Sequence, residues 1–222
     1  GVPTAIKDNT DSAGLPTQQG STAFTAIPAK ADSDFAKQFL STGAISIGKT
    51  RLPEFGFSAS TEYMTEEPVH NPWNPAYSSG ASSGGAAALV AAGVLPIAHA
   101  NDGGGSIRIP AAACGLVGLK PTRGRTIADP ADKSMPIRLI AQGAVTRTVR
   151  DTARWMSAAE NYYRNPRLAP VRLIEGPSST RLRVGVIADS VTVTKTDDET
   201  RKSVEATAEL LASLGHHVED AA

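Results

Sequence analysis

The sequence has few features that would suit charged partners, disulfide bridges or a membrane. One cysteine in 222 residues excludes an internal disulfide framework. The 22 basic residues balance the 22 acidic ones, and binding to phosphates or anionic lipids needs a basic surplus. No apolar run reaches the roughly 18 residues that span a bilayer. The opening GVPTAIKDN lacks the basic start and apolar core of a signal peptide. We therefore expect a cytoplasmic protein without nucleic-acid or membrane partners.

Glycine, in contrast, is abundant, with 20 residues, many of them between Gly80 and Gly124 beside serine and alanine. Such a segment is typical of a backbone that turns tightly or approaches a ligand closely. The length suits one large domain or two small ones, with enough chain to bury a real core.

Hydrophobic periodicity predicts alternating strands and helices with an irregular stretch between them. Ser82 and Ser83 are candidate N-caps for the second helix, and Thr148 is the candidate for the third. The expected strands cover 2–7, 44–48 and 94–100, the helices 32–42, 84–93 and 148–160, and the irregular stretch 51–79.

The last 43 or so residues, 180–222, predict a β–α–β unit with a parallel crossover. A strand over 182–187 is followed by a capping box from Thr196 to Glu199, a helix that stops at Gly215, and a second strand that starts with HHVED. The expected apolar face of the helix consists of Val204, Ala208, Leu211 and Leu214. Because the chain stops as this strand begins, we expect a partial domain.

Three short motifs suggest chemistry that their context does not support. Residues 43–50 match the P-loop pattern, and Ser46 with Lys49 matches the serine–lysine pattern S-x-x-K. Both patterns need a loop or helix, whereas this segment alternates as a strand, so we expect only a strand that ends in a lysine. Residues 80–84 match the nucleophile elbow G-x-S-x-G, but no apolar strand precedes them.

The elbow motif would also need a histidine base. The four histidines are assigned to a loop, a strand and a helix end, so none is in a context that indicates a base: His70, His99, His216 and His217.

Two loops rich in serine and glycine, 80–85 and 102–106, remain as candidate functional segments, together with Lys7 at a strand end. Gly103, Gly104 and Gly105 carry no side chains that would block their N–H groups, so these groups can form an anion-binding nest. Ser106 follows directly, with its hydroxyl beside those donors.

Several stretches resemble the amidase signature enzymes. They are GVPTAIKDN (1–9), GASSGGAAA (80–88) and NDGGGSIRIPAAACGLVGLKPTRGR (101–125), supported in the same order by GKTRLPEFGFSAS (48–60) and VTRTVRDTA (145–153). The resemblance covers most of residues 1–151 and is weaker beyond.

The resemblance implies a role for each residue that matches the family pattern. Ser106 is the expected nucleophile, Ser82 the bridging serine in a cis peptide bond, and Lys7 the general base. Burial and nearby dipoles must then lower the pKa of this lysine. The expected oxyanion hole is formed by the backbone of Gly103, Gly104, Gly105 and Ser106. The expected supporting residues are Ser83 beside the lysine, and Asp102 and Arg108, which hold the loop.

Some residues depart from the family pattern. Ala81, Arg51, Gly103 and the stretch 77–79 occupy positions where the family usually carries other residues. These departures leave the chemistry intact and leave the substrate open. Cys114 resembles a buried structural thiol.

The resemblance implies an α/β fold with a mixed, twisted sheet and helices on both faces. It implies a catalytic core in 1–151, with N-terminal and C-terminal flanks missing. The expected activity is hydrolysis of a small, neutral carboxylic amide through an acyl-enzyme, without metal or organic cofactor, and assembly into a homodimer is left open. Two alternatives also remain: the glutaminase subunit of a tRNA-dependent amidotransferase, and a catalytically inactive binding module.

Overall fold

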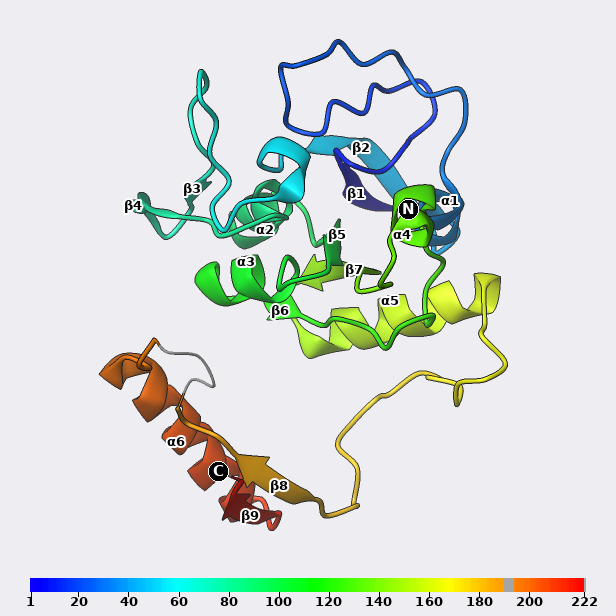
Figure 1. Ribbon diagram of the computed structural model, residues 1–222. Helices are drawn as coiled ribbons and strands as arrows, with labels where there is room; N and C mark the ends of the chain where they lie inside the picture. The colour runs from blue at the N-terminus through cyan, green and yellow to red at the C-terminus, as the bar shows by residue number, and fades with distance from the viewer. Residues whose placement is uncertain (190–193, 222) are drawn as a thin grey trace. The chain divides into compact units, whose positions relative to one another are not determined.

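The computed structural model describes residues 1–189 and 194–221 (Figure 1). The chain divides into two compact units, Gly1–Glu175 and Gly176–Ala222. The first contains every residue to which the resemblance assigns a role, and the second contains the predicted β–α–β segment.

The central strands of the first unit form a parallel pair and a three-stranded antiparallel sheet. They are β1 (Val2–Lys7), β2 (Ala44–Thr50), β5 (Ile97–Asp102), β6 (Val117–Gly118) and β7 (Ala141–Thr146). β1 and β2 pair in parallel, whereas β7 pairs antiparallel with both β5 and β6. The hydroxyl of Thr4 donates to the carbonyl of Ile97 at 3.0 Å, so β1 lies beside β5. Parallel and antiparallel pairs are therefore both present in the first unit, and the expected α/β fold is confirmed.

One strand differs from its prediction in a way that matters for the site. The prediction for 94–100 ended before Asn101, but β5 starts at Ile97 and continues through Asp102. The reason is its partner strand: Asn101 pairs with Gln142, and Asp102 pairs with Ala141 in the antiparallel register. Asn101 and Asp102 are therefore held on a buried strand rather than in a loop.

Helices and a short hairpin surround these strands. They are α1 (Asp34–Leu40), η1 (Glu54–Gly56), the hairpin β3 (His70–Asn71) with β4 (Asn74–Ser78), α2 (Gly84–Ala91), α3 (Arg108–Ala113), α4 (Pro130–Ser134) and α5 (Val149–Tyr162). Thr148 caps α5 as predicted, because its hydroxyl accepts a hydrogen bond from the N–H of Asp151 at 3.1 Å. Ser83, one of the two candidate N-caps, occupies the N-cap position of α2, but its side chain makes no capping hydrogen bond.

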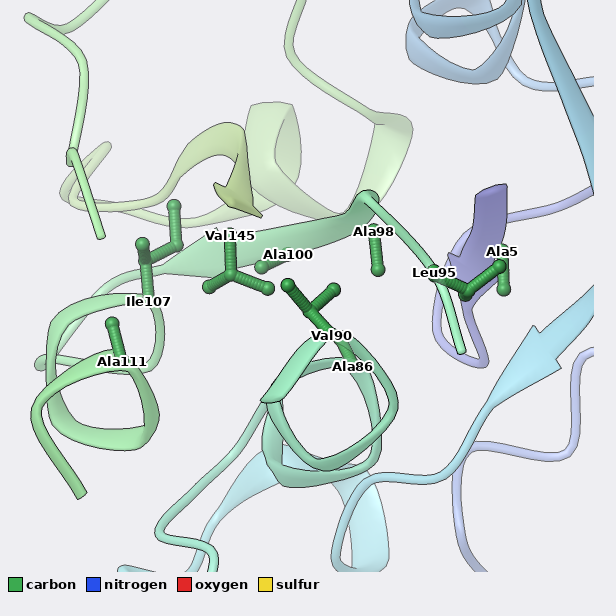
Figure 2. Packing of buried hydrophobic residues seen from close by; sticks show 9 residues of the cluster. All are labelled: Ala5, Ala86, Val90, Leu95, Ala98, Ala100, Ile107, Ala111 and Val145. Atoms are coloured by element: carbon green, nitrogen blue, oxygen red, sulfur yellow. The ribbon is translucent and has the colours of Figure 1, made fainter. Parts of the chain in front are cut away.

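The apolar core consists of two clusters because neighbouring residues of a strand point to opposite faces. Figure 2 shows the first cluster, where Val90 of α2 points toward Ala98 and Ala100 of β5. The second cluster joins α1 and α5 to the strands, and adjacent strand residues divide between the two clusters. These pairs are Ala5 and Ile6, Ala98 and Ile97, Val145 and Ala144. Helices therefore cover both faces, as expected.

Phe39 is the centre of the second cluster, and its loss should be costly. Its ring is fully buried, with centroids 5.9 Å from Phe35, 5.8 Å from His99 and 5.5 Å from Trp155. We expect Phe39→Ala to lower the free energy of unfolding by about 3–5 kcal/mol, measured by denaturant titration. Phe57→Ala is the control, because Phe57 is 90% exposed; equal losses for both variants would contradict this account of the core.

The second unit has the predicted order of strand, helix and strand. β8 (Arg183–Val186) pairs in parallel with β9 (His217–Asp220), and α6 (Asp198–Ser213) connects them. The N-cap of α6 is Asp197 rather than the predicted Thr196, because the Asp197 carboxylate accepts the N–H of Thr200 at 2.9 Å. This agrees with the ranking of N-cap residues, in which aspartate is preferred over threonine. Leu214, expected on the apolar face, is 54% exposed just past the helix.

Candidate active site

Lys7 is at the centre of a buried polar site at the end of β1. Its side chain is fully buried, and its Nζ donates to Ser82 Oγ at 2.8 Å and to Asn101 Oδ1 at 2.7 Å. Lys7 comes from β1, Ser82 from the turn before α2, and Asn101 from β5. The structure thus brings together the predicted lysine and bridging serine, 75 residues apart in sequence.

Burial gives Lys7 an unusual protonation state. Removal from water lowers the pKa of its ammonium from 10.5 to about 7, although the negative charge of Asp102 acts in the opposite direction. A substantial fraction of Lys7 is therefore neutral near neutral pH, so its amine can accept a proton there.

The segment around Ser82 has the backbone that the resemblance implies. The Ala81–Ser82 peptide bond is cis, and Ser82 is almost fully buried. Ser83 was expected to support the lysine, but its hydroxyl faces the backbone carbonyl of Asn101 at 3.5 Å, so it contacts β5 instead. The segment also needs glycine: a Cβ on Gly85 would lie 2.6 Å from the carbonyl oxygen of Arg51.

Asp102 holds the loop that leads to Ser106. Its buried carboxylate accepts the N–H of Gly105 at 2.7 Å and of Ile107 at 3.2 Å, and the Arg108 guanidinium at 2.9 and 3.0 Å. Burial disfavours the charge on Asp102, but these hydrogen bonds outweigh it and lower its pKa. Asp102 is thus an ionised anchor for the loop, with contacts that fit the expected role of Asp102 and Arg108.

The same contacts change the expected oxyanion hole. Because the N–H of Gly105 is donated to Asp102, it is not available to a ligand. Across residues 1–189 and 194–221, the N–H groups of Gly103, Gly104 and Ser106 make no hydrogen bond. Gly105 still has to be glycine, because its φ is +126° and a Cβ would lie 2.7 Å from the side chain of Ile109.

Ser106 follows this loop, and its hydroxyl has no hydrogen-bond partner among the described residues. The residue is half-buried, and its Oγ makes no hydrogen bond within the described part of the chain, including none to Ser82. Hydrogen bonds of a catalytic serine often form only once a substrate is bound, so this geometry is compatible with a nucleophile.

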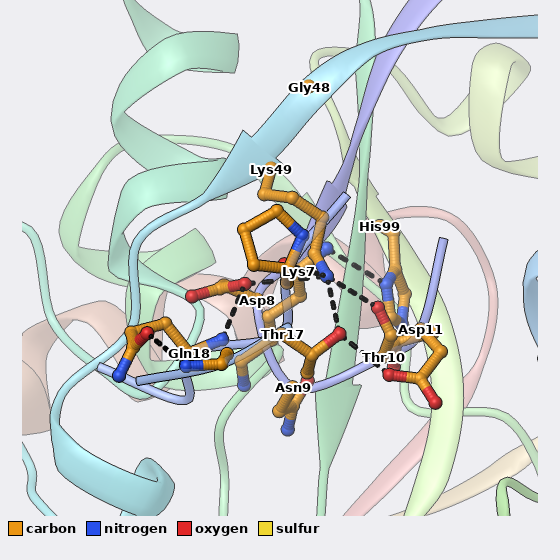
Figure 3. A network of polar contacts seen from close by, with 12 residues as sticks. Lys7, Asp8, Asn9, Thr10, Asp11, Thr17, Gln18, Gly48, Lys49 and His99 are labelled. Atoms are coloured by element: carbon orange, nitrogen blue, oxygen red, sulfur yellow. Dashed lines mark hydrogen bonds and ion pairs between the residues drawn. The ribbon is translucent and has the colours of Figure 1, made fainter. Parts of the chain in front are cut away.

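Two residues of the site were missed by the sequence analysis. Asn101, which the sequence analysis gave no role, accepts from the Lys7 ammonium and exchanges hydrogen bonds with Asn9 at 3.1 and 3.4 Å. His99, assigned only to a strand, accepts the backbone N–H of Lys7 at its Nδ1, 3.1 Å away (Figure 3). The only signals in the sequence were a lone histidine within an apolar run and an asparagine at the end of that run. Neither signal indicates which residue it contacts in the folded protein.

The motifs that the sequence analysis set aside have structural roles. Lys49 is in strand β2, and its Nζ donates to the Thr10 carbonyl at 2.8 Å and the Thr17 hydroxyl at 3.0 Å and pairs with Asp8 at 3.3 Å, as Figure 3 shows. It therefore holds the segment that follows β1, as a strand lysine rather than a phosphate ligand. Cys114 is buried, and burial raises the pKa of its thiol.

No cluster of three or more histidine, cysteine or acidic side chains in the described residues is arranged to hold a metal ion. Among those residues, no helix is both long and apolar enough to cross a bilayer.

Known proteins resemble this chain over nearly its whole length. AmiC of Mycobacterium tuberculosis (strain ATCC 25618 / H37Rv), which is named as an amidase, is 52% identical over 219 residues, covering 99% of this chain and 46% of AmiC. A glutamyl-tRNA(Gln) amidotransferase subunit of Synechococcus sp. (strain CC9311) is 39% identical, covering 99% of this chain and 46% of that protein. The chain spans about half the length of these curated relatives.

The fold has a close counterpart among solved structures. The structure of 6-aminohexanoate cyclic dimer hydrolase matches with a TM-score of 0.85 and 34% identity, covering 99% of this chain and 48% of that one. The family model described as Amidase matches residues 1–222. On the evidence of this match and of these relatives, the chain belongs to the Amidase family.

Proposed function

We propose that the protein hydrolyses the C–N bond of a carboxylic amide through a serine acyl-enzyme, with its catalytic groups within 1–151. The observation that carries the proposal is the 2.8 Å contact between Lys7 Nζ and Ser82 Oγ inside a buried site. A lysine held there with a pKa of about 7 is a competent proton acceptor near neutral pH.

In the first step, Ser106 Oγ forms a bond to the amide carbonyl carbon while its proton passes to Ser82 Oγ. Ser82 passes its own proton to the neutral Nζ of Lys7. The attack by Ser106 leaves a negative charge on the carbonyl oxygen. The unpaired N–H groups of Gly103, Gly104 and Ser106 are the candidates to stabilise that oxygen. The C–N bond then breaks as the proton returns through Ser82 to the departing amine.

In the second step, water attacks the acyl ester and gives up a proton along the same route. The acid leaves, and Ser106 recovers its proton from Ser82. This cycle uses only groups of the chain and water. We still predict that the reaction needs no metal or organic cofactor, that the substrate is a small amide and that the protein is cytoplasmic. Assembly into a homodimer stays open.

The labelling rate of Ser106 by a fluorophosphonate should depend on the protonation of Lys7. We expect the rate to rise with pH through about 7 and then to level off, because the amine must be neutral to accept the proton. Labelling is measured by mass spectrometry of the serine peptide. A rate that does not change across this range would contradict the role of Lys7 as base.

A second candidate function is suggested by the 39% identity to a glutamyl-tRNA(Gln) amidotransferase subunit. A glutaminase subunit of this kind would release ammonia from glutamine for a partner protein. Release of amine from simple aliphatic or aryl amides, without ATP or partner, supports the hydrolase. Turnover restricted to glutamine, and stimulated by a partner, would support the amidotransferase role instead.

A folded protein whose Ser106 is not labelled would favour the inactive binding module.

A further inference from the structure

A hydrogen-bonded series of three buried side chains connects Lys7 to α4. The backbone N–H of Lys7 donates to His99 Nδ1 at 3.1 Å, His99 Nε2 lies 2.9 Å from Gln142 Oε1, and Gln142 Nε2 donates to Asp132 Oδ2 at 2.7 Å. Each of these side chains is at most 5% exposed. Buried polar groups in such a series have no water to replace a lost partner.

The direction of every hydrogen bond in this series is determined. A backbone N–H can only donate, so His99 Nδ1 must carry a lone pair. Burial lowers the pKa of His99 to about 3, so the ring is neutral and its one proton is on Nε2. Nε2 therefore donates to Gln142 Oε1, and the amide NH₂ of Gln142 is directed at the carboxylate of Asp132. Gln142 thus sets the tautomer in which His99 can accept from Lys7.

Packing keeps the imidazole in place. Its centroid lies 4.8 Å from that of Phe35 and 5.8 Å from that of Phe39, both in α1. The ring is thus fixed by aromatic contacts as well as by its two hydrogen bonds.

Strand β5 holds Lys7 at both ends through two residues on the same face. His99 accepts from the Lys7 backbone, and Asn101, two residues further along, accepts from the Lys7 ammonium at 2.7 Å. The backbone contact sets where the long lysine side chain starts, and the asparagine contact sets where it ends. Between these two contacts, Nζ lies 2.8 Å from Ser82 Oγ.

We propose that His99 is a positioning residue for Lys7, held in the Nε2–H tautomer by Gln142. This inference rests on the proposed function, because it assigns His99 a role in aligning the base of that reaction. His99 does not contact the reacting atoms, and it acts through the backbone of Lys7.

Three variants distinguish the contact of His99 with Lys7 from its contact with Gln142. His99→Leu removes both hydrogen bonds of the ring, whereas His99→Asn leaves an amide oxygen where Nδ1 accepts from Lys7. Gln142→Leu removes the partner that sets the tautomer, together with the hydrogen bond from Gln142 to Asp132. We expect His99→Leu to lower kcat by about 100-fold with little change in KM, since misplacing a catalytic group by an ångström has such an effect. His99→Asn should recover most of the rate, and Gln142→Leu should lie between the two.

Turnover is measured per serine labelled by the fluorophosphonate when labelling has gone to completion, so that neither slower labelling nor loss of folded protein counts as loss of turnover. His70→Leu is the matched control, because His70 is an exposed histidine of the hairpin. Equal kcat per labelled serine in His99→Leu and the unmodified protein would overturn the positioning role and leave His99 as a core residue.

An NMR readout tests the inference without any turnover. The ¹⁵N shifts of His99 should report a neutral ring with the proton on Nε2 across the neutral range, and the Lys7 amide should be protected from hydrogen exchange. That protection should be lost in His99→Leu and kept in His99→Asn. A charged ring or the Nδ1–H tautomer would overturn the inference even in an active enzyme. Absence of turnover with the expected NMR result would instead count against the proposed function.

Discussion

Replacement of Ser106 by alanine is expected to abolish amide turnover while leaving the fold intact. Loss of the nucleophile in a serine hydrolase lowers kcat on the order of 10⁶-fold. The Ser106 hydroxyl makes no hydrogen bond within the described residues, so its removal leaves no buried polar group without a partner. We therefore expect the free energy of unfolding to change by no more than about 0.5 kcal/mol. The measurements are amine release and denaturant titration.

Ser46→Ala is the matched control for Ser106→Ala. Ser46 belongs to the serine–lysine pattern of strand β2, where its hydroxyl donates to the carbonyl of Gly48 at 3.1 Å. Full activity in Ser46→Ala and none in Ser106→Ala would assign the nucleophile. Retained turnover and labelling in Ser106→Ala would refute the proposed mechanism.

Replacement of Lys7 by methionine is expected to lower turnover by about 10²- to 10⁴-fold, the usual contribution of a general base. It should also change how stability depends on pH. Below about pH 7, Lys7 is charged in the folded and unfolded states, and burial of that charge destabilises the folded protein. Between about 7 and 10.5, only the unfolded state binds the proton, so the stability of the unmodified protein rises with pH.

The predicted quantity is the difference in free energy of unfolding between the two proteins. Relative to Lys7→Met, the unmodified protein should gain a few kcal/mol across this window, since one pKa unit corresponds to about 1.4 kcal/mol. Taking the difference removes the contribution of groups common to both proteins. Lys37→Met, at an exposed position of α1, should leave turnover nearly unchanged. If the free energy of unfolding changes with pH in the same way in the unmodified protein and in Lys7→Met, the pKa of Lys7 is not lowered by folding.

The chemistry of the candidate site is concentrated at the ends of two strands and in two loops. Lys7 and Asn101 come from neighbouring strands, and Ser82 comes from the turn before α2. Two glycines of the site are explained by close approach of the backbone at Gly85, in the first turn of α2, and by a positive φ at Gly105 in the second loop. Neither loop works alone, because Lys7 reaches only the first, and the expected nucleophile is on the second.

Local patterns predicted those features that depend on residues close in sequence. The Thr148 cap of α5, the helix over 84–91 and the strand–helix–strand order of the second unit all follow from periodicity and capping within a few residues. The roles of Lys7, Ser82 and Ser106 came from motif resemblance, and the first two are indeed in contact.

The amino-acid sequence by itself thus determined the local elements and the chemical groups available to the site. Only the tertiary structure decided which groups meet. The register of β5 with β7 put Asn101 on a strand beside Lys7, and Asp102 took the N–H of Gly105 that the oxyanion hole was expected to use. His99 meets the backbone of Lys7 across 92 residues of sequence. Spacing cannot specify such pairs, because a buried donor selects its acceptor by proximity in the folded core.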